Sequence, residues 1–273
     1  MDNKIAAIVV LYNPGISFID NINTYSKYVD NIIVIDNSSA NNHHLLAGFQ
    51  TLTYIPLNEN MGISSALNIG CNKAIELKCN LALTMDQDSS FEKDQITRFI
   101  SLSNGHFTNL DIAIVAPSWL CSQSVDLTVE CNSVITSGNL VRLSAWQSIG
   151  GYNEDYFIDE VDHEFCYRLR DAGYKIVLLG NVSIRHNLGN PLLIKWFGRT
   201  ITSSNHSVDR RYYLTRNRLL CRRDHPQYKR PFISVLFRDV VNILLVEPHK
   251  LRKLWAIACG FYDYKIGRAG KRP

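Results

Sequence analysis

Short, continuous apolar runs rich in β-branched residues recur along the first third of the chain. They cover residues 5–11, 32–35, 52–57 and 81–85. Runs of this length without polar alternation are typical of strands that are buried on both faces. Apolar residues at helical spacing predict helices near 16–25 and over 63–77. Strands that alternate with helices in this order predict an α/β fold, with a mainly parallel sheet covered by helices on both faces.

The second half of the chain has a less regular pattern. A strand is expected at 112–116, a short strand at 134–136, and a helix over 161–172 that Gly173 ends as a C-terminal cap. Two strands are expected at 175–179 and 182–185. From Asp209 the pattern predicts helices that Pro226, Pro231 and Pro248 separate. We therefore expect an α/β domain over residues 1–208 and a helical extension over 209–273.

Polar clusters follow the end of each of the first four strands. They lie at residues 12–13, 36–39, 58–62 and 86–89. In open α/β sheets, ligands bind outside the carboxyl ends of the strands. We therefore expect these clusters to converge on one crevice.

Composition sets limits on the class of protein. With 273 residues, 46% hydrophobic and 20% charged, the chain has the make-up of a globular protein, which excludes disorder, collagen and coiled coil. The apolar stretch 232–246 is interrupted by Arg238 and Asp239 and is shorter than the roughly 20 residues of a membrane span. No signal peptide is evident, and seven cysteines without a C-x-x-C pair favour reduced thiols. We expect a cytoplasmic protein.

Charge is distributed unevenly along the chain. Residues 1–194 hold 11 Lys and Arg against 20 Asp and Glu, whereas residues 195–273 hold 18 against 5. The extension is therefore strongly basic, and the segment 209–218 has enough arginines to hold a diphosphate.

Two carboxylates, Asp86 and Asp88, follow the fourth strand as a D-x-D sequence. Oxygen ligands of this kind bind hard divalent cations, which can stabilise a diphosphate leaving group. The alternative is a capped turn before a helix that begins near Phe91. His186 follows a later strand and could complete a metal site with Asp88, although a packed or surface histidine is the common case.

Two of the other polar clusters suit a nucleotide. Asp36 could accept a hydrogen bond from N3–H of uracil or thymine, with Tyr12 and Asn13 in the same slot, although an Asx turn explains Asp36 equally well. Asn60-x-Gly62 precedes a helix whose first N–H groups favour phosphate, although it also reads as a plain helix start.

The densest acidic cluster, residues 159–164, opens the helix expected at 161–172. Like charges three or four residues apart on a helix repel each other and destabilise it, unless the negative electrostatic potential serves a function. One of these carboxylates could be a general base, provided that it faces the crevice. The alternative is the ordinary preference of helix starts for acidic residues.

Four segments in order give the chain its resemblance to a known family. They are Val9-Val10-Leu11-Tyr12-Asn13-Pro14, Met85-Asp86-Gln87-Asp88-Ser89, Phe157 to Glu164, and His186-x-Leu188-Gly189. Over roughly residues 4–220 the chain resembles the inverting family 2 glycosyltransferases of the GT-A fold. Within that family it looks most like bacterial rhamnosyltransferases that build O-antigen and other surface polysaccharides.

The resemblance assigns roles to individual residues. Asp162 becomes the catalytic base, with Asp159 and Glu160 as alternatives, because Val161 and Glu164 depart from the family's E-D-x-D-L motif. Asp88 and His186 would bind Mg or Mn. Donor-binding residues would be Tyr12, Asn13, Asp36, Asn60, Gly62, Asp86, Gln87 and Asp88. Acceptor-binding residues would be Ser137, Gly138, Glu164, Arg211 and Arg216.

The reaction implied is a single displacement that moves L-rhamnose from dTDP-L-rhamnose to a lipid-linked glycan. A UDP-sugar donor is the alternative within the family. The basic extension would rest on an anionic membrane at the inner face of the plasma membrane, or else pack on the core or form a homodimer.

Three other classes compete with a transferase. A nucleic-acid-binding protein would use the basic, aromatic extension, but this leaves the acidic crevice unexplained, so no nucleic-acid partner is expected. A nucleotidyltransferase lacks its Gly-rich signature after the first strand. A non-catalytic sugar-nucleotide-binding protein would keep the fold without the chemistry.

Overall fold

The computed structural model describes residues 3–49, 52–118, 128–186, 192–196, 199–228 and 230–272. The chain forms two compact units, each described by itself. The first unit comprises residues 1–154 and 165–187, and the second comprises 155–164 and 188–273. The functional boundary expected at residue 208 stays a prediction.

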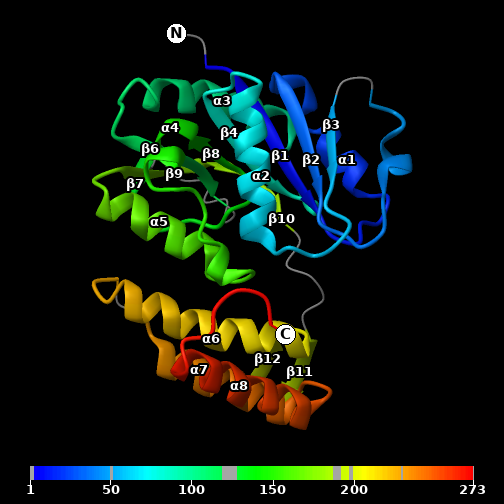
Figure 1. Ribbon diagram of the computed structural model, residues 1–273, viewed down its shortest axis with the longest axis vertical. Coiled ribbons are helices and arrows are strands. Elements are labelled where there is room, and N and C mark those ends of the chain that lie inside the picture. Colours follow the sequence, from blue (N-terminus) through cyan, green and yellow to red (C-terminus); the bar gives the residue numbers. More distant parts are fainter. Residues whose placement is uncertain are drawn as a thin grey trace. The chain divides into compact units, whose positions relative to one another are not determined.

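An eight-stranded sheet in the order β3-β2-β1-β4-β8-β6-β9-β7 forms the centre of the first unit (Figure 1). Neighbours β3, β2, β1 and β4 are parallel, as are β6 and β9, whereas β8 and β7 run antiparallel to their partners. The strands are β1 (Ile5–Leu11), β2 (Asn31–Asp36), β3 (Thr53–Pro56), β4 (Leu81–Asp86), β6 (Ile112–Ser118), β7 (Thr128–Glu130), β8 (Asn139–Arg142) and β9 (Lys175–Ser183). The predicted mainly parallel sheet is confirmed.

Strand β1 is buried along its whole length because helices cover both of its faces. On one face, Ala7 and Val9 share a core with Phe18 of helix α1 (Phe18–Asn23) and Phe99 of helix α3 (Lys93–His106). On the other face, Ile8 meets helix α2 (Ile63–Glu76), where a Cβ on Gly70 would lie 2.3 Å from Ile8 Cγ2. The apolar run of β1 therefore has no polar face, as its pattern predicts.

The sequence prediction was wrong in three places in the first unit. Residues 134–136 form no strand, because the chain turns at Gly138 and pairs with β4 only from Asn139 onward. The two strands expected at 175–179 and 182–185 join into one strand over 175–183, β9, whose pairing with β6 shifts register between Pro117 and Ser118, and Arg185 belongs to a separate two-residue strand, β10 (Arg185–His186). The first helix, expected near 16–25, is limited to α1.

Two further helices and three 3-10 turns complete this part of the described chain. Helix α4 spans Leu143–Ser148, and α5 spans Val161–Asp171, ending before Gly173 at φ +89°. The first residues of α5, 161–164, belong to the second unit and the rest to the first. The 3-10 turns are η1 (Ser26–Tyr28), η2 (His43–Leu46) and η3 (Glu154–Tyr156).

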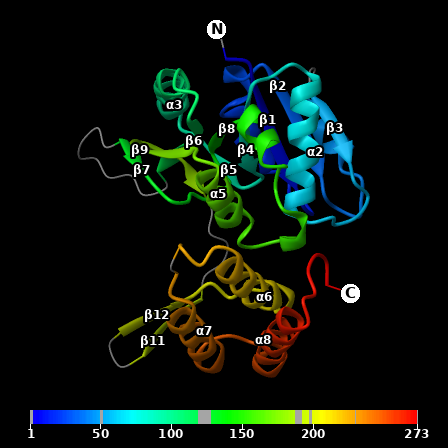
Figure 2. The ribbon, with the colours of Figure 1, turned by 60° about the vertical axis from the view of Figure 1, so that its left-hand side comes forward.

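The second unit contains three helices and a hairpin (Figure 2). The helices are α6 (Val208–Asp224), α7 (Phe232–Leu245) and α8 (Lys250–Lys265), and the hairpin pairs β11 (Leu192–Trp196) with β12 (Arg199–Ser203). Helices α6 and α8 pack closely, because a Cβ on Gly260 would lie 2.6 Å from the carbonyl oxygen of Tyr212. The breaks predicted at Pro226, Pro231 and Pro248 are confirmed.

Within the described part of the chain, no helix has both the length and the hydropathy that a bilayer span requires.

Candidate active site

The polar loops at the carboxyl ends of the parallel strands bond to one another. Tyr12 N–H donates to Gln87 Oε1 at 2.8 Å, which joins the loops after β1 and β4. Asn13 N–H donates to Ser38 Oγ at 2.8 Å, which joins the loops after β1 and β2. The amide of Asn37 donates to Asn60 Oδ1 at 3.1 Å. The predicted convergence of these four clusters is therefore confirmed.

Asp86, Asp88 and His186 form a cluster at this edge of the sheet. One ligand atom of each lies within 4.8 Å of those of the other two. A short antiparallel pair, β5 (Ser89–Ser90) with β10 (Arg185–His186), places His186 opposite Ser89. The Ser89 hydroxyl lies 2.7 Å from His186 Nδ1.

The donor set of this cluster suits a divalent cation. Two carboxylates are ligands for Mg²⁺ and Mn²⁺, and an imidazole nitrogen is more typical of transition metals. Asp88 is half-exposed, so that a cation could keep further positions for phosphate oxygens. These residues therefore fit the expected metal, and the fit extends the expected pair Asp88 and His186 to Asp86.

Ser137 and Gly138 lie behind the D-x-D turn. The Ser137 hydroxyl accepts a hydrogen bond from the backbone N–H of Asp86 at 3.0 Å, and Gly138 N–H donates to Thr84 O at 2.7 Å. Gly138 has φ +89°, and a Cβ there would lie 2.6 Å from Ile184 Cδ1. Both residues are buried and shape the turn, so their expected contact with the acceptor stays a prediction.

Asp36 is buried and its carboxylate is already bonded. Oδ2 accepts from the Tyr54 hydroxyl at 2.6 Å and from both nitrogens of Asn42, and Oδ1 accepts from Ser38 N–H. Burial raises the pKa of Asp36, but these hydrogen bonds outweigh it and lower the pKa below its usual range. The Asx-turn reading is therefore realised through Ser38, and a nucleobase contact stays a prediction.

The loop after β3 is shaped for a close backbone approach. Asn60 Oδ1 accepts from Gly62 N–H at 3.0 Å, and Gly62, with φ +90°, precedes helix α2. That conformation favours glycine. Tyr12, in the loop after β1, is 51% exposed. Both features agree with a nucleotide site here, and the individual donor contacts stay predictions.

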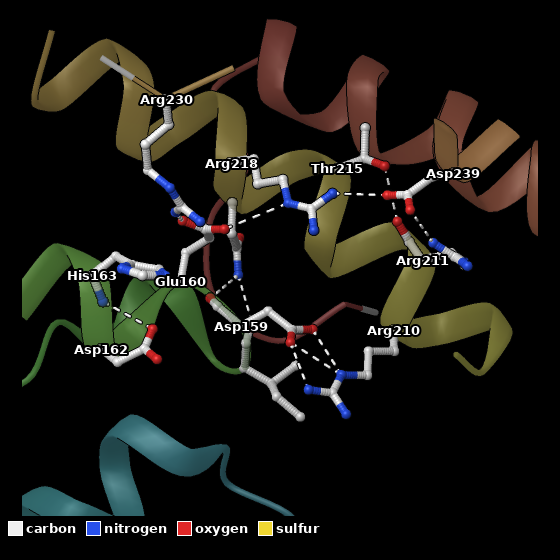
Figure 3. Close-up of polar contacts among 12 residues, drawn as sticks. Asp159, Glu160, Asp162, His163, Arg210, Arg211, Thr215, Arg218, Arg230 and Asp239 are labelled. Carbon is white, nitrogen blue, oxygen red and sulfur yellow. Dashed lines mark hydrogen bonds and ion pairs between the residues drawn. The ribbon is translucent and has the colours of Figure 1, made fainter. Parts of the chain in front are cut away.

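The three candidate carboxylates for the base, Asp159, Glu160 and Asp162, differ in their partners (Figure 3). Asp159 forms an ion pair with Arg210 at 3.0 Å, and Glu160 pairs with Arg230 and with Arg218. Asp162 Oδ1 accepts only from the backbone N–H of His163, at 2.8 Å. Among the residues that the structure describes, Asp162 forms no ion pair. Of the three candidates for the base, Asp162 is therefore the one with a carboxylate that no cation occupies.

Burial raises the pKa of Asp159, and the charge and hydrogen bonds of Arg210 oppose that rise. Arg210 Nε contacts both carboxylate oxygens of Asp159, at 3.0 and 3.3 Å, so Asp159 would have to leave Arg210 before it could receive a substrate hydroxyl. This asymmetry favours Asp162.

Arg211 and Arg216 do not present free guanidinium groups. Arg211 is 2% exposed and pairs with Glu247 and Asp239, and Arg216 is 0% exposed. Arg216 donates to Asn217 Oδ1, to Gly270 O and to Asp155 O. Glu164 is buried as well. Their expected contact with an acceptor stays a prediction, and the geometry favours a structural role for both arginines.

Several residues of these sites were missed in the sequence. Tyr54 and Asn42 hold Asp36, Ser89 contacts His186, and Asn217 contacts the loop before α5. The three contiguous polar residues 215–217 are all buried in α6, although nothing in the helical periodicity marks them as buried.

Comparisons with known proteins agree with this geometry. Residues 17–117 match the family described as Glycosyl transferase family 2. The chain is similar to the dTDP-rhamnosyl transferase RfbF of Shigella flexneri, with 26% identity over 92% of this chain and 90% of that protein.

Solved structures share the fold. A crystal structure of GalNAc-T7 with UDP, GalNAc and Mn²⁺ matches 90% of this chain with a TM-score of 0.56 and 13% identity; the match spans 58% of that protein's chain. A structure of S. aureus TarS 1-349 matches 97% of this chain and 72% of its own, with a TM-score of 0.54 and 14% identity. These similarities, with the sheet order, give the first unit the GT-A fold.

Proposed function

We propose that this chain is an inverting rhamnosyltransferase, because residues 17–117 match Glycosyl transferase family 2 and solved structures share its fold. The donor is dTDP-L-rhamnose and the acceptor is a hydroxyl group of a lipid-linked surface-polysaccharide glycan. The observation that carries the proposal is the presence of two distinct acidic sites, the Asp86–Asp88–His186 cluster and the unpaired Asp162. The similarity to RfbF supports the choice of donor.

The reaction is a single displacement with inversion at the anomeric carbon. The acceptor oxygen forms a bond to that carbon while the bond to the diphosphate breaks, and dTDP leaves. Asp162 takes the proton of the acceptor hydroxyl as the new bond forms. Asp162 is in the first turn of α5, and the helix fixes the position of its backbone.

Asp86, Asp88 and His186 would hold Mg or Mn, which neutralises charge on the departing diphosphate when bound. The surrounding residues fix the positions of these three side chains. Ser137 fixes the backbone of Asp86, and the β5–β10 pair fixes His186. The loops that carry Tyr12, Asn60 and Gly62 enclose the nucleotide on the same side of the sheet.

The membrane is the proposed place of the lipid-linked acceptor. Helix α7 exposes Ile233, Phe237 and Leu244, and α8 exposes Leu251, Trp255 and Tyr262. Residues at these spacings form one stripe on each helix. Exposed Arg238, Lys250 and Arg252 flank the stripes. An apolar face with basic flanks and tryptophan suits an anionic bilayer at the cytoplasmic side; a homodimer through this face is the alternative.

Calorimetry tests the donor and the metal together. Purified protein is titrated with dTDP, UDP and GDP, each in Mn²⁺ and in EDTA, and turnover of dTDP-L-rhamnose is followed with a glycan acceptor. Metal-dependent preference for dTDP supports the proposal. A preference for UDP would support a transferase whose donor is a UDP-sugar instead of dTDP-L-rhamnose. If no nucleotide binds, the protein is not a nucleotide-sugar-dependent transferase, and the non-catalytic classes become the candidates again.

A further inference from the structure

The loop from Asp155 to Glu160, directly before α5, has an unusual backbone. Phe157, Asp159 and Glu160 have φ values of +55°, +62° and +64°. Residues with a Cβ rarely adopt this left-handed region, and three such residues within four positions are maintained only where the surroundings enforce it. Val161 follows immediately as the first residue of α5, and Asp162 is the second.

Asn217 of helix α6 bonds to the backbone of this loop. Its side-chain amide donates to the carbonyl oxygens of Tyr156, of Ile158 at 2.7 Å and of Asp159 at 3.2 Å. Arg216 Nε donates to Asn217 Oδ1 at 2.9 Å, which turns the amide nitrogen toward the loop. Arg216 also donates to Asp155 O at 3.1 Å. Both side chains are fully buried, so neither reaches a ligand directly.

Other residues of α6 hold the loop through its side chains (Figure 3). The Tyr213 ring stacks on Phe157, with ring centroids 5.0 Å apart. Arg210 pairs with Asp159, and Arg218 pairs with Glu160. Each of the three left-handed residues is thus held by a contact from α6.

We propose that Asn217, oriented by Arg216, is a positioning residue for the catalytic base. The left-handed turns at Asp159 and Glu160 set the direction in which α5 begins, and therefore where the Asp162 carboxylate points. Asn217 stabilises this stretch by donating to the carbonyl oxygens of Ile158 and Asp159, directly before Glu160. The proposal rests on the proposed role of Asp162. It gives the polar face of α6 a function other than binding a diphosphate.

The test compares Asn217→Ala with a matched control, Asn242→Ala. Asn242 is a buried amide on α7, in the same unit. A displaced base lowers turnover steeply, since a misplacement of about 1 Å can cost about 100-fold. We expect Asn217→Ala to lower kcat about 10- to 100-fold, with KM for the donor and Kd for dTDP·Mn²⁺ within about twofold. Asn242→Ala is expected to lower Tm while kcat stays within about twofold.

A rescue experiment separates positioning from general stability. Glycine adopts left-handed φ without strain, so Asn217 should matter less where residue 159 is glycine. Asp159→Gly also removes the ion pair with Arg210, so this single variant is the baseline, and adding Asn217→Ala to it is expected to lower kcat by no more than about twofold further. Asn217→Ser is the milder variant if Asn217→Ala does not fold, and it is expected to show the same selective loss of kcat. The inference is overturned if the folded Asn217 variant keeps native kcat, if Asn242→Ala lowers kcat as much, or if Asn217→Ala lowers kcat as far in the Asp159→Gly protein as in the native protein.

Asp162→Asn is measured in parallel. If it retains native kcat, the proposed base is wrong and the proposed mechanism fails. If it loses kcat while Asn217→Ala does not, the mechanism stands and only the positioning role fails.

Discussion

Nδ1 of His186 lies 3.6 Å from Oδ1 of Asp88. The two residues come from distant parts of the chain and meet because the two-residue strands β5 and β10 pair. A metal-binding role for either one therefore depends on the same small piece of sheet.

Removing one of these ligands is expected to weaken metal-dependent nucleotide binding. Asp88→Ala and His186→Ala should each raise the Kd of dTDP in Mn²⁺ by about 10-fold or more, within the range known for the loss of groups that tune a metal site, while the weak binding in EDTA stays unchanged. Isothermal calorimetry measures both. Asp94→Ala, an exposed acid in the first turn of α3, is the control. Equal nucleotide affinity with and without metal in the native protein would contradict a metal site at these residues.

Asp162→Asn is expected to lower kcat by about 10²- to 10⁴-fold, the usual contribution of a general base. The amide keeps the shape of the side chain but cannot accept the acceptor's proton. Nucleotide affinity should stay native, because the nucleotide contacts are expected in the first unit. Steady-state kinetics with calorimetry measures the two effects, and native turnover in this variant would return Asp159 and Glu160 as candidates.

Glu247→Gln is expected to destabilise the second unit by about 3 to 5 kcal/mol. Glu247 is buried between Arg211 and Lys253 and accepts from the Ser203 hydroxyl. The variant therefore leaves buried Lys253 without its anion and removes one of the two anions that pair with Arg211, the other being Asp239. Thermal unfolding measures the loss. Glu130→Gln, which removes an exposed pair with Arg170, serves as the control and should change stability by at most about 1 kcal/mol.

The same residue gives a pH dependence. Burial raises the pKa of Glu247, but hydrogen bonds from Lys253 and Ser203 and the charge of Arg211 outweigh it and lower the pKa. A lowered folded-state pKa contributes stability above the unfolded pKa, and this contribution is lost as pH falls through the folded value. The difference in Tm between the native protein and Glu247→Gln should therefore shrink from pH 7 toward pH 3. A constant difference would contradict the pairing.

Two glycine variants are expected to have opposite effects. Gly138→Ala should destabilise by more than about 1 kcal/mol, because Gly138 has φ +89° and its Cβ would press on Ile184 and Pro117. Gly105→Ala lies in α3 with open space around it and should stabilise by about 0.5 to 1 kcal/mol. Chemical denaturation compares the two, and a neutral Gly138→Ala would contradict the tight turn behind Asp86.

The proposed membrane face is tested with vesicles. Phe237 and Trp255 are each 69% exposed, so Phe237→Ser combined with Trp255→Ser should abolish flotation with vesicles of anionic phospholipid without loss of Tm. Leu110→Ser, at an equally exposed site in the first unit, is the control. Concentration-dependent dimers that the double variant disrupts, without vesicle binding, would favour the homodimer instead.

The first four strands and the meeting of their polar ends followed from local pattern. Buried β-branched runs and polar strand ends are visible in the sequence, and convergence follows from parallel topology. The strand at 139–142 was misplaced, because its position depends on a turn at Gly138 that only packing against Ile184 and Pro117 explains. The structural roles of Arg211 and Arg216 could not be predicted from the sequence. Their partners Glu247, Asp239 and Gly270 lie far along the chain, and no periodicity reveals such pairing.

The second unit is assembled from two separate stretches of chain, 155–164 and 188–273. During synthesis, residues 155–164 leave the ribosome before the residues of α6, α7 and α8 have been made. During that interval Asp159 and Glu160 have no arginine partners, and the loop before Asp162 has no Asn217 to hold its shape. A nascent chain stopped at residue 187 would contain the D-x-D cluster without an organised base. Truncation at that point should therefore separate donor binding from sugar transfer, with the order of synthesis deciding when the protein becomes a catalyst.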